Sequence, residues 1–446
     1  MRNNRSNNRS RSSRRDAHKK VIVKYLPFLV LIVGVLAICA YEIPWEDIFP
    51  PTPPPPTTTQ EIYFTKGAEP HLATIYLDNS ASMQGYAKGI QYLDALADLM
   101  SIYPNTEARL MSDSAMVIKK GSDLISKLAN NDINYVGQSL LNSDLEYIVS
   151  DIEKAYKMKK TKIAFFVTDG IMCGPDSEIR KDSNYNINHR QDLTNSISDV
   201  FKGKGLGVSV YRLVSDFKGV YYCYDNSHKP INALRSFYII AIGKPEVVSD
   251  FKETLIKRQK QSIFKLRPQN EIHFIESKPI NQYISINAGT DGNVVLSIDK
   301  NNTVVYDRSK IKSNTDINFH ISFDAFKNYK LSGGDLAKNV QVTIDGTPYK
   351  AVTVVDSLRN AIIAKVDKTF LKGRSDGSKV HITIPYFTPA WIASPFVSND
   401  NDLRFKQGRA DESTFFFNYF INGIMNGVLS SSGFNIYDRE LLFKCK

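Results

Sequence analysis

Short apolar runs alternate with longer amphipathic stretches between residues 69 and 260. Residues 72–77 and 163–167 are apolar at nearly every position, which is typical of strands buried on both faces of a sheet. After each run, apolar residues recur at helical spacing, as they do from Leu141 to Tyr156. Strands alternating with helices predict a doubly wound, mostly parallel α/β sheet. The expected strands are residues 71–77, 107–111, 115–118, 162–167, 206–214 and 237–242. Two helices are expected to begin near Ile90 and Leu141, and two more to cover residues 189–202 and 247–257. Residues 219–224 are expected to add an edge strand or hairpin.

Beyond residue 260 the pattern changes to short strand-like runs separated by Gly, Asn and Asp at roughly ten-residue intervals. This rhythm predicts a β-rich, sandwich-like domain over residues 261–446. Its expected strands are residues 293–298, 303–306, 317–323, 340–344, 361–366 and 379–386. A terminal helix is also expected, because Phe417, Phe420, Ile421, Ile424 and Val428 fall on one helical face. The polar side of that helix lacks basic flanks, so we expect it to dock on a domain and not on a membrane.

The chain begins with a basic tail, an apolar segment and a proline-rich stretch. Residues 1–20 contain almost no apolar side chains and are expected to be disordered. Residues 21–43 include an uncharged run from 25 to 41, long enough for a transmembrane helix. Lysines and arginines precede the segment and acidic residues follow it, which predicts a cytoplasmic amino terminus and extracytoplasmic domains. A cleaved signal peptide, or a lipidated Cys39, remains an alternative. Residues 44–68 contain the Pro/Thr-rich spacer.

Charge is concentrated at the amino terminus. Residues 1–24 hold nine Lys and Arg against one Asp, a balance of +8, so only +3 of the net +11 belongs to the remainder. The nearly balanced remainder gives no reason to expect nucleic-acid binding. The four cysteines have no zinc-binding spacing, and a bridge between Cys173 and Cys223 stays open.

Oxygen-bearing side chains follow the ends of two predicted buried strands. Asp78, Ser80 and Ser82 form an Asp-x-Ser-x-Ser pattern after the first strand, and Asp169 lies in the Thr-Asp-Gly that ends the strand at 162–167. Ser139 lies at the entrance of the helix between them. Carboxyl ends of parallel strands form the crevice in which such sheets bind ligands. Carboxylate and hydroxyl oxygens are the ligands that hard cations prefer.

The order and spacing of these residues resemble the metal-ion-dependent adhesion site of von Willebrand factor type A domains. The resemblance covers residues 69–260, with Ser139 standing where the family has Thr. It implies Mg²⁺, or Mn²⁺ or Ca²⁺, held by Ser80, Ser82 and Ser139 directly and by Asp78 and Asp169 largely through water. An open coordination position would then accept an acidic residue of a protein partner.

The sequence therefore predicts a membrane-anchored, extracytoplasmic protein that binds a partner through a metal. No signature of an enzyme is found, since the seven histidines are scattered and no nucleophile elbow or phosphate loop is present. Two alternatives remain open: a metal-free structural scaffold of a cell-envelope assembly, and an unrecognised hydrolase in the carboxyl-terminal region.

Overall fold

The computed structural model describes residues 72–446, with gaps. The gaps are residues 104, 112–115, 119–120, 131–132, 134–140, 223–224, 226, 276–279, 289–293, 308, 310–315, 327–328, 330, 372–376, 401–411 and 430–434. The predicted tail (1–20), membrane span (21–43) and linker (44–68) lie outside the described residues, as does Ser139. Within the part that is described, no helix combines the length and the apolar composition needed to cross a bilayer.

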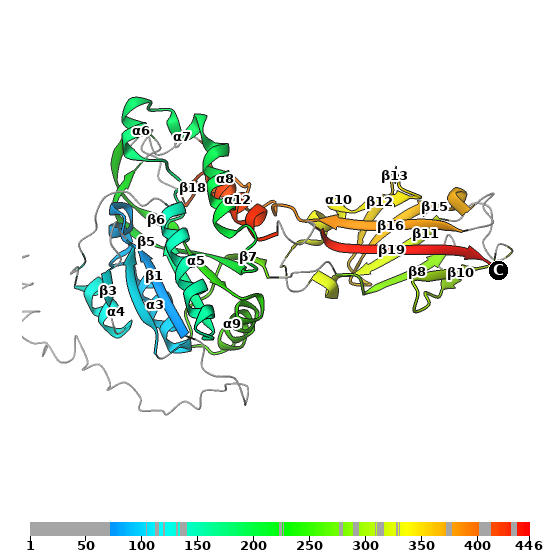
Figure 1. The fold of residues 1–446 in the computed structure, drawn as a ribbon, viewed down its shortest axis with the longest axis horizontal. Coiled ribbons are helices and arrows are strands. Elements are labelled where there is room, and N and C mark those ends of the chain that lie inside the picture. Colours follow the sequence, from blue (N-terminus) through cyan, green and yellow to red (C-terminus); the bar gives the residue numbers. More distant parts are fainter. Residues whose placement is uncertain are drawn as a thin grey trace, which may run out of the picture. The chain divides into compact units, whose positions relative to one another are not determined.

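The amino-terminal half of the described chain forms a seven-stranded sheet of order β3-β2-β1-β4-β6-β5-β7 (Figure 1). β1 lies between β2 and β4 and runs parallel to both. The other four pairings, β2–β3, β4–β6, β5–β6 and β5–β7, are antiparallel. The strands are β1 (Leu72–Asp78), β2 (Glu107–Met111), β3 (Met116–Ile118), β4 (Lys162–Thr168), β5 (Gly207–Tyr222), β6 (His228–Gly243) and β7 (Asn270–Phe274).

The prediction of an α/β fold is confirmed, but that of a mostly parallel sheet is wrong. β5 and β6, each 16 residues long, form one continuous hairpin and not two strands joined by a helical crossover. Two strands joined by so short a connection can pair only antiparallel. Residues 219–222, expected as an extra edge element, are the end of β5, which lies between β6 and β7.

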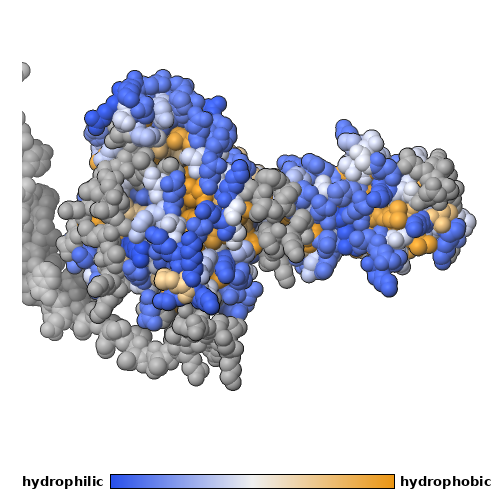
Figure 2. Space-filling view, viewed as in Figure 1, coloured by the Kyte–Doolittle hydropathy of each residue, from blue (hydrophilic) through white to orange (hydrophobic). Residues whose placement is uncertain are grey.

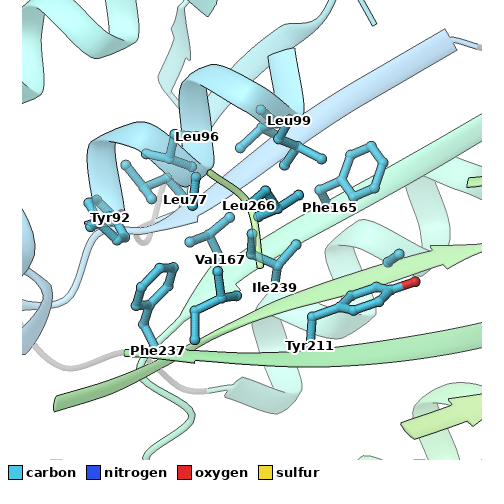
Figure 3. Packing of buried hydrophobic residues seen from close by; sticks show 14 of the residues in the cluster. Leu77, Tyr92, Leu96, Leu99, Phe165, Val167, Tyr211, Phe237, Ile239 and Leu266 are labelled. Carbon is cyan, nitrogen blue, oxygen red and sulfur yellow. The ribbon is translucent and has the colours of Figure 1, made fainter. Parts of the chain in front are cut away.

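Helices cover both faces of this sheet. α3, α4 and α9 pack on the face that carries Ile75 and Leu77 of β1, and α5, α8 and α12 cover the face that carries Tyr76. Figure 3 shows Tyr92, Leu96 and Leu99 of α3 over apolar side chains of β1, β4 and β6. The helices are α3 (Ile90–Ile102), α4 (Gly121–Ala129), α5 (Leu141–Lys157), α6 (Asp176–Lys181), α7 (Tyr185–Asn188), α8 (Arg190–Phe201), α9 (Pro245–Arg258) and α12 (Phe417–Leu429), with a 3-10 helix η1 (Ala81–Tyr86) after β1.

The terminal helix α12 belongs to the core of this α/β part although it follows the β-rich segments in sequence. Phe417, Phe420, Ile421 and Ile424 are buried, which confirms the predicted apolar stripe. α12 packs on α8 at a contact made of glycines: a Cβ at Gly427 would lie 2.3 Å from the Ser198 carbonyl oxygen. The α/β core therefore extends beyond the predicted boundary at residue 260 and includes a returning segment near the end of the chain.

The residues between 280 and 388, together with the end of the chain, form two five-stranded sheets that share one apolar core. The six strands expected here are present, whereas β8, β13, β14 and β19 were not anticipated. β19 occupies an interior position between β10 and β16. One sheet contains β10 (Thr303–Tyr306), β19 (Asn435–Cys445), β16 (Ser378–Pro385), β12 (Gln341–Ile344) and β13 (Thr347–Tyr349), and the other contains β14 (Val352–Asp356), β15 (Ala361–Asp367), β11 (Asp316–Ser322), β8 (Ile284–Ala288) and β9 (Val294–Leu296), with α10 (Gly333–Asn339) beside β14.

The glycine contact between α12 and α8 predicts the sign of a substitution. Alanine normally stabilises a helix interior by up to about 1 kcal/mol relative to glycine. At Gly427 the added methyl would meet the Ser198 carbonyl, so we expect Gly427→Ala to destabilise the protein by about 1–3 kcal/mol in urea unfolding. Gly334→Ala on α10, where the nearest atom lies 4.0 Å away, is the matched control and should be neutral or stabilising. A stabilised Gly427→Ala protein would contradict the packing.

Candidate functional site

The register of β1 and β4 brings the two predicted sequence motifs together. Leu77 and Val167 are partners in the parallel pairing, so both strands end at the same level of the sheet. The Thr168 hydroxyl donates a hydrogen bond to Asp78 Oδ2 at 2.7 Å, and Asp169 directly follows the end of β4. Residues that are 90 positions apart in the sequence thus meet at one edge of the sheet.

The turn after β1 folds back on its own carboxylate. The Ser80 amide donates to Asp78 Oδ1 at 2.8 Å, which uses the carboxylate to close the turn. The Ser80 and Ser82 hydroxyl oxygens lie 3.0 Å apart, and η1 begins at the residue between them. Asp78, Ser80 and Ser82 are all buried, so their oxygens are gathered in a small, poorly solvated space.

The second turn holds Asp169 in a similar way. The Ile171 amide donates to Asp169 Oδ1 at 3.2 Å, and the Gly170 amide donates to the Thr168 hydroxyl at 3.0 Å. Gly170 has φ +70°, a left-handed conformation that favours glycine, which explains the glycine of the Thr-Asp-Gly sequence. Ser82 also hydrogen-bonds Asp169, so the two turns are joined through this pair as well.

Burial raises the proton affinity of both carboxyl groups, and the charge of Asp169 raises that of Asp78 further. Burial, then the charges of Asp169 and Asp144, raise the pKa of Asp78 to about 7. Burial also raises the pKa of Asp169, while the hydrogen bond from Ser82 and the positive charge of Arg235 oppose the increase. Excess negative charge at a site with little water is the condition that a bound cation relieves.

Four of the five predicted site residues therefore come together: Asp78, Ser80, Ser82 and Asp169. The fifth, Ser139, lies outside the described residues. Sequence reasoning missed Thr168, although it stands beside Asp169 in the motif. It also missed Asp144, in the first turn of α5, and Arg235, for which the sequence offers no signal.

Arg235 of β6 is a buried cation that interacts with Asp169. Its side chain is 1% exposed, its guanidinium carbon lies 4.3 Å from the centre of the Tyr221 ring, and it also interacts with Tyr86. One of its Nη atoms donates to the Ser413 carbonyl at 3.3 Å. Arg235 therefore supplies part of the positive charge that the buried Asp169 requires.

A segment from near the end of the chain completes the surroundings. The Thr414 hydroxyl donates to the Asp169 backbone carbonyl at 3.4 Å and accepts from the Tyr238 hydroxyl at 3.1 Å. The Phe417 ring stacks on Tyr238 with centroids 3.9 Å apart. Residues 412–417 are thus fixed against the loop that carries Asp169.

A second cluster contains a hydroxyl, an imidazole and a carboxylate but lies inside the sheet. Ser209 Oγ is 2.8 Å from His273 Nδ1, and Glu271 is 3.5 Å from the other ring nitrogen. Ser209 is 0% exposed and His273 is 1% exposed. Since a substrate cannot reach a hydroxyl in that position, we assign this cluster to the hydrogen bonding of β5 and β7.

The donors at the end of β1 suit a hard cation better than a soft one. In the described part of the chain, no group of three or more His, Cys, Asp or Glu side chains is placed to hold a metal ion. Any ligand set here would combine the two carboxylates with the hydroxyls of Ser80 and Ser82. Oxygen ligands of this kind fit Mg²⁺, Mn²⁺ or Ca²⁺.

Comparison with models of protein families finds no match for this chain, and comparison with curated proteins finds none either.

The raised pKa of Asp78 predicts a pH dependence in chelated, metal-free protein. Because its pKa is higher folded than unfolded, stability is fully present at low pH and is lost as pH rises through about 7. Asp78→Asn should remove this dependence, leaving the variant more stable than the parent at about pH 8 by up to about 4 kcal/mol. Urea unfolding at about pH 5 and about pH 8 measures the difference. The exposed Asp324→Asn is the control, and parallel curves for Asp78→Asn and the parent would refute the assignment.

Proposed function

We propose that this protein is a metal-dependent binding module whose site lies at the carboxyl ends of β1 and β4. The observation that carries the proposal is the buried pair Asp78 and Asp169, joined through Thr168 and Ser82 and short of compensating positive charge. The resemblance of the motifs to those of type A domains also supports a metal-dependent binding module. The antiparallel β6 between β4 and β5 departs from the arrangement expected of that family.

The serines and the aspartates would have different roles at such a site. Ser80 and Ser82 would ligate the ion through neutral hydroxyls, and Ser139 is the candidate for a third hydroxyl. Asp78 and Asp169 would act largely through water and would orient the serines; the contacts of Asp78 with the Ser80 amide and of Asp169 with Ser82 support this role. When bound, the ion supplies a position for an external oxygen ligand. With only two carboxylates among these residues, the ion keeps positive charge, which favours an acidic residue of a protein partner.

The apolar residues 21–43 support a place for the module at a membrane. We propose that they anchor the chain with the amino terminus in the cytoplasm and residues 69–446 outside, because basic residues precede the segment and acidic residues follow it. The proline-rich residues 50–59 would serve as a spacer. An enzymatic role is not part of this proposal.

Substitution of Asp78 tests the metal. We expect Mg²⁺ to raise the melting temperature of the parent protein, with a stabilisation of about 2.7 kcal/mol at a Mg²⁺ concentration one hundred times the dissociation constant. Asp78→Ala should abolish both this shift and the heat of Mg²⁺ binding in calorimetry, while Asp324→Asn keeps both. An unchanged Mg²⁺ affinity in Asp78→Ala would overturn the proposal.

A metal-free structural scaffold is the second candidate, and Arg235 favours it. Its buried guanidinium already offsets part of the charge on Asp169. In a scaffold, Arg235 would serve permanently as the cation of the site, and the β-rich part would make the contacts of the assembly.

Replacement of Arg235 separates the two candidates. Arg235→Met should cost about 3–5 kcal/mol in urea unfolding, because it leaves the buried Asp169 without its positive partner. If the site binds metal, Mg²⁺ should restore part of that loss. If the protein is a metal-free scaffold, Mg²⁺ should restore none of it. Arg359→Met, whose side chain is 62% exposed, controls for the loss of one positive charge.

A further inference from the structure

Exposed lysines gather at the end of the sheet opposite the candidate site. The chain enters the described fold at Leu72, whose amide donates to the Thr161 carbonyl at 2.9 Å. Residues 157–160, at the carboxyl-terminal end of α5 and in the turn before β4, lie at this same end. They read Lys-Met-Lys-Lys, and all four are exposed. We call the following set the lysine face: Lys154, Lys157, Lys159, Lys160, Lys202, Lys204 and Lys244.

Two contacts show that these lysines form one surface. Lys204, in the turn between α8 and β5, forms an ion pair with Glu153 of α5 at 3.1 Å. The Lys244 amide donates to the Tyr156 hydroxyl at 2.7 Å, and the Lys244 ammonium lies 4.8 Å from the centre of the Tyr156 ring. The turns before β5 and after β6 therefore both meet the carboxyl-terminal end of α5. In Figure 2 the surface around the lower end of α5 is predominantly hydrophilic.

The lysine face is positively charged and carries exposed apolar side chains. Residues 153–161, 199–206 and 244–246 hold seven lysines against Glu153, Asp199 and Glu246, a balance of 7 − 3 = +4. Met158 is 63% exposed and Leu72 is 46% exposed on this surface. A protruding apolar side chain among lysines fits a layer of anionic headgroups above hydrocarbon.

The dipole of α5 does not account for this arrangement. Lysines in a last helical turn are ordinarily favoured by the negative end of the helix, which explains Lys154 and Lys157. Lys244 stands at the N-cap of α9, where the same effect disfavours a cation. Neither the dipole nor the packing of the core requires Met158 to be exposed.

We propose that the lysine face docks on an anionic membrane surface, specifically on the headgroups of the bilayer that anchors the chain. This inference rests on the membrane anchor proposed above. Residues 44–71, a stretch of 28, connect the predicted span to Leu72. Covalent geometry limits the reach of 28 residues to at most about 100 Å, so the anchor keeps the face next to Leu72 within that distance of the bilayer. At such a distance, a weak electrostatic attraction suffices for docking, because the local headgroup concentration is high.

Docking in this way would orient the candidate site. Leu72 begins β1 at the lysine face, and Asp78 ends the same strand at the site. A membrane beneath Leu72 would leave the Asp78 and Asp169 turns directed away from the lipid, toward the space in which a protein partner is found. The sheet would thus separate a positively charged, membrane-facing end from a negatively charged binding end.

Lysine acetylation measured by mass spectrometry tests the proposal on the full chain. The protein is reconstituted in phosphatidylcholine vesicles, and in vesicles that also contain a minority of phosphatidylglycerol. With phosphatidylglycerol, we expect acetylation of Lys157, Lys159 and Lys202 to slow by about tenfold, and to recover at high salt. The exposed Lys338 and Lys350 in the β-rich part should react equally in both vesicles.

Paired variants supply the control. Lys159→Gln with Lys160→Gln should remove the protection of Lys157 and Lys202, whereas Lys338→Gln with Lys350→Gln, the same change in charge, should leave it intact. Equal reactivity of the lysine face in the two vesicles would overturn the docking, whether the lysines react fast or slowly in both. Flotation with neutral vesicles and resistance to carbonate extraction report the anchor separately, so failure of the anchor and failure of the docking are distinguishable.

Discussion

The parallel pairing of β1 with β4 is the constraint on which the candidate site depends. It places Asp78 and Thr168 at one level, where the Thr168 hydroxyl donates to the Asp78 carboxylate. A slip of one residue would turn every side chain of a strand to the opposite face of the sheet. It would also move Ile75 and Leu77, which lie on the face covered by α3, to the face covered by α5 and α8. The register that buries the core is therefore the register that assembles the site.

Buried negative charge gives the site its chemistry. Asp78 and Asp169 lie close together where water is scarce, and burial is the largest cause of the raised pKa of each. Hydroxyls and backbone amides satisfy the carboxylate oxygens, yet hydrogen bonds alone do not supply a full positive charge. Arg235 supplies part of it. The balance between this fixed guanidinium and an exchangeable cation determines whether the same geometry serves binding or only structure.

The hairpin and the returning segment shape the neighbourhood of the site. The β5–β6 hairpin brings Arg235 to the Asp169 carboxylate, and residues 412–417 bring Thr414 to the Asp169 carbonyl. Arg212 of β5 also pairs with Glu412 at 2.6 Å, which fastens the returning segment to the sheet. Each of these contacts joins residues far apart in sequence. The part of the chain that follows the β-rich segments is thereby a structural component of the site.

The sequence by itself determined most of the local elements and indicated most of the residues that meet at the candidate site. Apolar periodicity is a local property, so it placed β1, β4, α5, α8, α9 and the buried stripe of α12. It also indicated Asp78, Ser80, Ser82 and Asp169 as candidate site residues, since they lie at or shortly after the ends of two buried strands. Only the tertiary structure decided that β6 runs antiparallel beside β4, that α12 packs on α8, and that Arg235 faces Asp169. Those outcomes depend on pairing and packing between segments far apart in the sequence. A local pattern of residues does not predict the energies of such contacts.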